Sequence, residues 1–195
     1  MGVRVIAGSA RGRQLKGPPG RGRANSAGVR PSSDLVRGAL FDSLSAMDAD
    51  FTRIVDLYAG TGALGIEALS RGGQHCDFVE KDRALAAIIR HNLTATGFTD
   101  NAEIIAAPVE RAVDYLSGPY TLVLADPPYA DEEALALIAR LMANGIIDAE
   151  SGTIAFEHST RAEPPADIAG FSLARSLRHG DSSVSIYRPS TPGGN

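Results

Sequence analysis

Short apolar runs alternate with segments of helical periodicity from Arg53 onward. The apolar runs predict strands at residues 53–57, 76–80, 102–106, 121–125 and 153–158. The spacing of apolar residues between them predicts helices at 63–71, 83–96, 109–116 and 132–143. Because strand, helix and strand in succession form right-handed crossover units, this order predicts a mostly parallel sheet with helices on both faces.

The pattern differs at both ends of the chain. Residues 171–177 and 184–188 predict two strands joined by a short turn, which makes an antiparallel hairpin at one edge of the parallel sheet. Residues 3–15 predict a short hairpin with arginines at its turn, and a helix is expected from Pro31 to about Met47. The fold class expected is therefore α/β, a Rossmann-like seven-stranded sheet with an edge hairpin, preceded by a β-hairpin and a helix.

Length and composition favour one globular core. The chain has 195 residues, of which 44% are hydrophobic, and we expect a basic amino-terminal arm and loop at 1–30, a main domain at 31–188 and a flexible tail at 189–195. No apolar run approaches the roughly 20 residues of a membrane span, and no signal-peptide core is visible, so we expect a cytoplasmic protein without membrane contact. The single cysteine, Cys76, suits a small core position, and the histidine spacing indicates no metal site.

The charge is divided unevenly along the chain. Residues 1–37 hold eight basic groups and one acidic group, whereas the remaining 158 hold 11 basic and 22 acidic groups. This asymmetry favours a basic arm that binds a nucleic-acid backbone, with Arg11, Arg13 and Arg30 as the candidate phosphate contacts. Arg37, on the helix that follows, is also expected to be able to reach a substrate.

A glycine-rich loop joins the first predicted sheet strand to its helix. Gly60, Gly62 and Gly65 allow the backbone to pass close to a ligand at the carboxyl edge of the sheet. The spacing also fits a dinucleotide fingerprint, with Glu80 as the acid that binds a ribose. Asp56 favours S-adenosylmethionine instead, because a carboxylate there can hold the loop and a cationic ligand, whereas a dinucleotide site receives a pyrophosphate anion.

A second motif, Asp126-Pro127-Pro128-Tyr129, follows the buried run at 121–125. Proline lacks an N–H, so Pro127 and Pro128 stiffen the backbone and leave carbonyl groups free to accept hydrogen bonds. A carboxylate, free carbonyls and an aromatic ring at one point suit a planar base that bears an amino group. A simple turn at the end of a strand is the alternative interpretation.

The motifs DLYAGTGALG, FVEKD and LADPPY, in this order, make the chain similar to class I S-adenosylmethionine-dependent methyltransferases that act on exocyclic amines. Together with RVIAGSARGRQL, RPSSDLVRGALFDSL, FEHS and HGDSSVSIYR, they make it resemble the RsmD family of small-subunit rRNA guanine-N2 methyltransferases over nearly the whole chain. The resemblance implies methyl transfer from S-adenosylmethionine to guanine N2 in 16S rRNA or the assembling small ribosomal subunit. Nothing in the sequence demands more than a monomer.

The resemblance also implies site residues. These fall in the cofactor loop (Asp56, Tyr58, Gly60 and Gly62), at the ribose (Glu80) and in the catalytic loop (Asp126, Pro127, Pro128 and Tyr129). Where many members carry a Gly-Asp pair that binds the adenine amine, this chain has Ala106-Ala107-Pro108-Val109, so no adenine-binding residue is assigned. The segment 21–29, between the expected hairpin and RPSSD, is longer than expected, and its role is open.

Three other functions fit parts of the pattern. A DNA adenine-N6 methyltransferase would use the same DPPY chemistry, a nicotinamide enzyme would use the glycine loop, and a non-catalytic RNA-binding protein would use the arm. In the methyltransferase hypotheses, Asp126 and the Pro127 carbonyl accept the two amine hydrogens while Tyr129 stacks on the base.

Overall fold

The computed structural model describes residues 3–18, 31–127 and 131–190, and in this part of the chain one mixed sheet forms the centre of the molecule. Its strand order is β3-β2-β1-β4-β5-β8-β7-β6. The first five strands are parallel to one another, and the last three are antiparallel to their neighbours. The strands are β1 (Arg53–Leu57), β2 (His75–Val79), β3 (Ala102–Ile105), β4 (Leu122–Ala125), β5 (Thr153–Ser159), β6 (Asp167–Ile168), β7 (Phe171–His179) and β8 (Ser182–Pro189).

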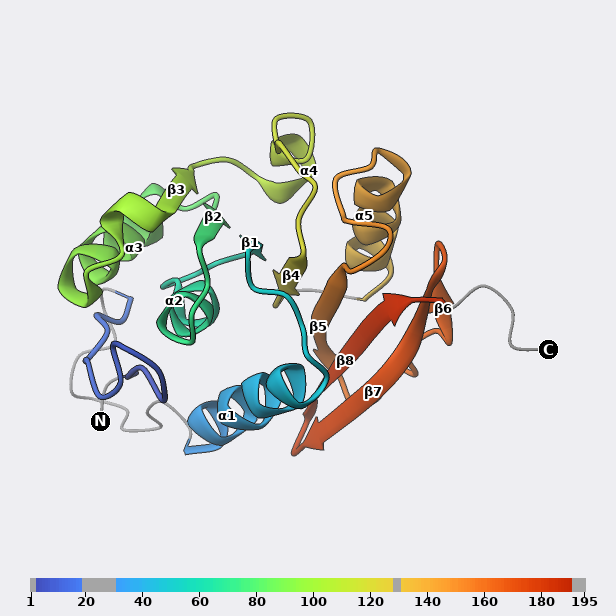
Figure 1. The fold of residues 1–195 in the computed structure, drawn as a ribbon, viewed down its shortest axis with the longest axis horizontal. Helices are drawn as coiled ribbons and strands as arrows, with labels where there is room; N and C mark the ends of the chain where they lie inside the picture. The colour runs from blue at the N-terminus through green and yellow to red at the C-terminus, as the bar shows by residue number, and fades with distance from the viewer. Residues whose placement is uncertain (1–2, 19–30, 128–130, 191–195) are drawn as a thin grey trace.

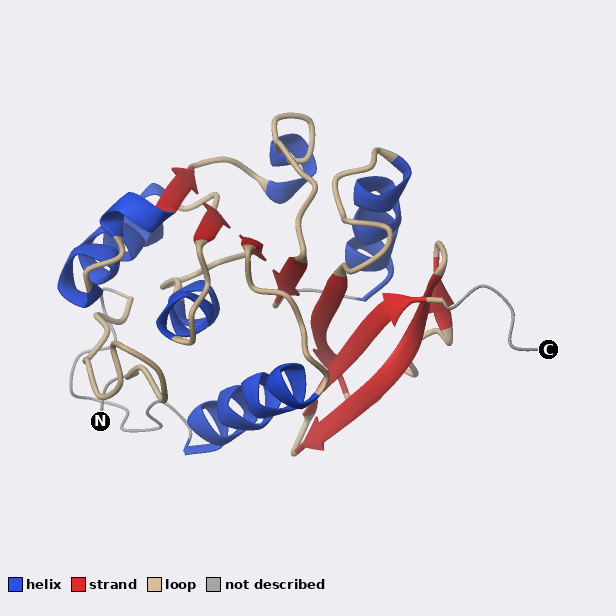
Figure 2. Ribbon diagram, viewed as in Figure 1, coloured by secondary structure: helices blue, strands red, loops and turns tan. Residues whose placement is uncertain are grey.

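Helices cover both faces of this sheet (Figures 1 and 2). One face packs against α1, α2 and α3, and the other against α4 and α5. Their bounds are α1 (Pro31–Ala46), α2 (Ala63–Ser70), α3 (Arg83–Thr96), α4 (Val109–Ala112) and α5 (Asp131–Ala143), with a 3₁₀ turn at Thr99–Asn101. Within these described helices, none has both the length and the apolar character needed to cross a membrane.

Alternation along the strands divides the core into two clusters. Ile54 of β1 and Phe78 of β2 face α2 and α3, whereas Val55 and Val79 face the layer of α4 and α5. All four side chains are buried, as expected for parallel strands covered on both faces. Cys76 is likewise fully buried, which confirms its prediction as a core residue.

Most predicted elements are present, but the predicted count of seven strands is wrong. The eighth strand, β6, has only two residues and pairs Asp167 with Ser172 and Ile168 with Phe171. Two residues are too few to show an alternating pattern, so no local signal predicts this strand. Otherwise the antiparallel hairpin of β7 and β8 confirms the predicted change of direction at this edge.

Two further predictions are only partly correct. The helix expected at 109–116 ends at Ala112, because Asp114 N–H and Tyr115 N–H bond to carbonyls three residues back, which tightens the chain into turns. Within the described residues 3–18, the two sides of the expected hairpin run antiparallel. They form a single β-bridge, between Arg4 and Gln14, in place of the expected pair of strands.

Candidate active site at the carboxyl edge of the sheet

The sheet reverses its strand order between β1 and β4. From β1 the chain continues toward β2 and β3 on one side, and from β4 it continues toward β5 on the other. At such a switch point the connections leave a crevice beyond the carboxyl ends of the two strands, where ligands of α/β proteins bind. The glycine loop follows β1 and Asp126 follows β4, so the topology brings the two predicted motifs to the same crevice.

The glycine loop needs its glycines for two different reasons. Gly62 has a φ of +78°, a left-handed conformation that side chains rarely adopt. At Gly65 the obstacle is space, because a Cβ atom would lie 2.4 Å from the Phe78 ring. A Cβ at Gly60 would approach only the Tyr58 carbonyl, at 3.9 Å, so the backbone there borders open space. Tyr58 itself is half-buried and adopts a φ of +60°.

Two buried carboxylates hold this loop in place. Asp56 Oδ2 accepts the Gly65 N–H at 2.8 Å, and Glu80 Oε2 accepts the Gly60 N–H at 2.8 Å. The other Glu80 oxygen accepts the Asp82 N–H at 2.8 Å. Burial, and then the nearby Asp126 and Glu80, raise the pKa of Asp56 to about 8 despite the hydrogen bond from Gly65. A cation close to Asp56 would therefore stabilise its charged form.

Asp126 and Pro127 come directly after the buried strand β4. Asp126 is exposed by surface area and Pro127 is half-buried. Partial burial and the charge of Glu157 raise the pKa of the Asp126 carboxyl to about 7. Pro128 and Tyr129, the other predicted residues of this motif, lie outside the described residues.

The amino-terminal segment, residues 3–18, lies against α2 and α3 (Figure 1). Glu67, fully buried on α2, accepts the backbone N–H groups of Ile6 at 2.7 Å and Ala7 at 3.0 Å. Gly8 passes so close to α2 that a Cβ atom would lie 1.8 Å from the Ser70 carbonyl oxygen. The segment is therefore fixed by its backbone, which leaves the side chains of Arg11 and Arg13 available, whereas Arg4 forms an ion pair with Asp34 at 3.7 Å.

The predicted phosphate contacts differ in their surroundings. Arg11 and Arg13 are exposed, and neither forms an ion pair with the described residues. Arg30 lies outside the described residues. For Arg37 the expectation of substrate contact is wrong, because its side chain is only 7% exposed and Nη2 donates to the Arg4 carbonyl and to Asp34. Arg37 ties helix α1 to the amino-terminal segment.

Sequence reasoning missed one residue that joins the segment to the glycine loop. Asn92 on α3 is fully buried, accepts the Lys16 N–H at 2.7 Å, and donates to the carbonyls of Lys16 at 3.1 Å and Thr61 at 2.9 Å. A lone asparagine in a helical pattern gives no signal of such a contact. For Glu67 a signal existed, because it is an acid within the otherwise apolar helix 63–70.

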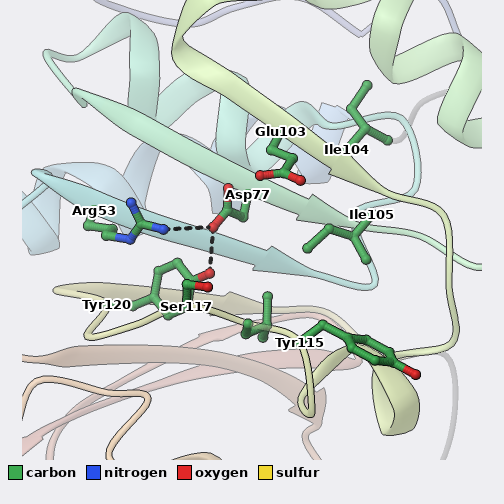
Figure 3. A pocket seen from close by; sticks show the side chains of 9 residues that line it. Arg53, Asp77, Glu103, Ile104, Ile105, Tyr115, Ser117 and Tyr120 are labelled. Carbon is green, nitrogen blue, oxygen red and sulfur yellow. Dashed lines mark hydrogen bonds and ion pairs between the residues drawn. The ribbon is translucent and has the colours of Figure 1, made fainter.

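A separate hollow of about 330 Å³ lies on another part of the sheet (Figure 3). It is lined by Arg53 at the start of β1, Asp77 within β2 and Tyr120 just before β4, among others. Asp77 Oδ2 accepts the Tyr120 hydroxyl at 2.5 Å and Arg53 Nη2 at 3.4 Å. None of the predicted site residues in the described part of the chain lines this hollow, and Arg53, Asp77 and Tyr120 bind one another across neighbouring strands.

Comparisons with known proteins cover nearly the whole chain. A family model described as "Conserved hypothetical protein 95" matches residues 3–188. The chain is 33% identical over 189 residues to "Putative rRNA methyltransferase YlbH" of Bacillus subtilis, covering 95% of this chain and 98% of the relative. It is 32% identical over 191 residues to "Ribosomal RNA small subunit methyltransferase D" of Escherichia coli K12, covering 98% and 92%. A solved "conserved hypothetical protein" of Streptococcus pyogenes is 35% identical with a TM-score of 0.71, covering 77% of this chain and 93% of that one.

Proposed function

This chain belongs to the RsmD family, described as Conserved hypothetical protein 95, and we propose that it transfers a methyl group from S-adenosylmethionine to guanine N2 in 16S rRNA. One observation carries the proposal. The glycine loop after β1 and Asp126 after β4 meet at the switch point of the sheet, where a methyl donor and an amine acceptor can be neighbours. The names of the near full-length relatives support RNA as the substrate.

The residues of the glycine loop fit S-adenosylmethionine, which supplies an electrophilic methyl group on a sulfonium when bound. Asp56 is a buried carboxylate with a raised pKa, so it gains most from a cationic ligand. Gly60 and Gly62 leave backbone beside the ligand, and Tyr58 lies between Asp56 and these glycines. Glu80 orients Gly60 and keeps lone pairs that can accept ribose hydroxyls.

Asp126 prepares the amine of the target base in this mechanism. An exocyclic amine on an aromatic ring is a weak nucleophile because its lone pair is delocalised. The Asp126 carboxylate and the Pro127 carbonyl accept the two amine hydrogens, which directs the lone pair toward the methyl group. Positive charge develops on the nitrogen as it bonds to the methyl carbon, Asp126 stabilises this charge, and the methylated amine then loses one proton. Pro128 stiffens the loop, and Tyr129 stacks on the base with a contribution of about 1–3 kcal/mol.

The amino-terminal segment is the proposed RNA-binding arm. The exposed Arg11 and Arg13, with Arg30, bind phosphates of 16S rRNA or of the assembling small subunit. The target guanine leaves its stack to reach Asp126, as in other base-modifying enzymes. In this proposal residues 1–30 serve substrate binding, residues 31–188 form the catalytic domain, and the enzyme acts as a monomer.

The proposal is tested with S-adenosylmethionine carrying a labelled methyl group. Unmodified 16S rRNA and duplex DNA are incubated separately with the wild type, Asp126→Ala and the control Glu103→Gln, which changes an exposed acid on the edge strand β3. We expect label on guanine N2 of the rRNA with the wild type and the control. Asp126→Ala loses this transfer but keeps its cofactor affinity. Label on adenine of the DNA, or full activity of Asp126→Ala, contradicts the proposal.

A further inference from the structure

Glu157 lies beside Asp126 at the carboxyl edge of the sheet, and the proposed mechanism does not use it. Strands β4 and β5 are parallel, and Ala125 is paired with Phe156, so Asp126 and Glu157 are the next residues on neighbouring strands. Parallel strands lie about 4.8 Å apart. Leu124 and Ala155, two residues earlier on each strand, belong to the same core cluster, so alternation brings both carboxylates toward one face.

Unlike Asp56 and Glu80, Glu157 has no hydrogen-bond donor among the described residues. Asp56 and Glu80 each accept backbone N–H groups, whereas Glu157 is half-buried and forms no hydrogen bond or ion pair with any described residue. Its charge also opposes ionisation of Asp126. Two neighbouring carboxylates with so few donors are unfavourable in the free protein, and a ligand rich in N–H groups would relieve this cost.

His158, which follows Glu157, is not available to a ligand. His158 Nδ1 lies 2.9 Å from the Ser159 carbonyl oxygen, and Nε2 lies 2.8 Å from Ser185 Oγ. Its ring stacks on Phe156 with a centroid distance of 5.7 Å. Both ring nitrogens are therefore occupied within the protein, and Glu157 is the member of this stretch that is left for a ligand.

Resting on the proposed function, we propose that Glu157 selects guanine by accepting the hydrogen bond of ring N1–H while Asp126 accepts a hydrogen bond from the N2 amine. Guanine presents N1–H and the N2 amine side by side, so two adjacent carboxylates, which can only accept, match this edge. Adenine has an unprotonated N1 next to its amine, and the lone pair of this N1 would face the Glu157 carboxylate. Glu157 thereby discriminates between the two bases that DPPY chemistry alone would accept.

The test compares guanine with 2-aminopurine at the target position of a 16S rRNA fragment, after the methylated nucleotide has been mapped. 2-Aminopurine keeps the exocyclic amine but lacks N1–H. The wild type is expected to prefer guanine in kcat/KM by about 10- to 100-fold. In Glu157→Ala this preference falls toward unity, and in Glu157→Gln, which keeps a neutral acceptor, it falls to an intermediate value. Comparing ratios between variants removes the intrinsic difference in amine reactivity.

Glu103→Gln and Glu103→Ala are matched controls and should keep the full preference. Binding of S-adenosylhomocysteine and the melting temperature show that each variant is folded. If Glu157→Ala does not fold, the nearly isosteric Glu157→Gln decides the question. An unchanged preference in the folded Glu157 variant, or no preference in the wild type, overturns the role of Glu157. If the wild type methylates neither fragment, the proposed function itself fails instead.

Discussion

Glu67 fixes the amino-terminal segment to α2, so Glu67→Gln should release this segment without unfolding the sheet. Its Oε2 accepts the Ile6 N–H at 2.7 Å, and its Oε1 accepts the Ala7 N–H at 3.0 Å and Arg71 Nε–H at 2.9 Å. Since both oxygens face donors, either orientation of the glutamine amide places an NH₂ group against a backbone N–H. One hydrogen bond of the segment is therefore lost, and the other is made to a neutral amide oxygen instead of a charged carboxylate.

The size of the effect follows from these two bonds. A hydrogen bond to a charged group contributes about 1.5–3 kcal/mol and a neutral one about 0.5–1.5 kcal/mol. Losing one charged bond and weakening the other costs the docked segment about 2–4 kcal/mol. Its opening equilibrium then shifts by about 30- to 700-fold, because about 1.4 kcal/mol corresponds to a factor of ten.

Native-state hydrogen exchange measures this opening directly. In Glu67→Gln, protection of the Ile6 and Ala7 amides should fall by at least about 30-fold, whereas the amide of Val55 in β1 stays protected. RNA affinity should fall in parallel, and Glu103→Gln should change neither quantity. If the Ile6 and Ala7 amides keep their protection in folded Glu67→Gln, the anchoring role of Glu67 is wrong.

Three further changes test the site and its link to the segment. Because the pKa of Asp126 is raised to about 7, kcat/KM of the wild type should rise from pH 6 to pH 8 as the carboxylate forms, and Asp126→Asn should abolish this rise along with most activity. A wild-type rate that is flat over this range contradicts the role of the ionised carboxylate. Asn92→Ala removes contacts to both Lys16 and Thr61, so calorimetry should show weaker binding of S-adenosylhomocysteine as well as of RNA; loss of RNA binding alone would refute the link. Charge reversal of Arg11 and Arg13 should lower RNA affinity and flatten its dependence on salt, whereas an unchanged slope would exclude them as phosphate contacts.

The raised pKa of Asp126 also has a consequence for the stability of the free protein. A carboxyl group whose pKa is higher in the folded state than its ordinary value of 3.8 binds its proton more tightly when folded. Its contribution to stability is therefore present at low pH and is lost as the pH rises from about 4 through about 7. Asp56, with a pKa raised to about 8, acts in the same direction.

The sequence alone predicted most of the elements because their signals are local. Helix 83–96 was predicted with the bounds that the structure gives, since its periodicity runs through the whole element up to Gly97. Strand β1 was predicted in the same way from a short apolar run bounded by polar residues. By contrast, the two-residue strand β6 depends on its pairing with β7, which no local pattern encodes.

The sequence by itself determined the alternation of strands and helices, the glycine loop and the Asp126 motif, because each is written in neighbouring residues. Only the tertiary structure decided which distant groups meet. It placed Glu157 next to Asp126 through strand pairing, and it buried Arg37, which the sequence alone suggested could reach a substrate. These arrangements depend on packing between elements far apart in the chain, where a residue type alone does not reveal whether a charge faces a partner, a ligand or water.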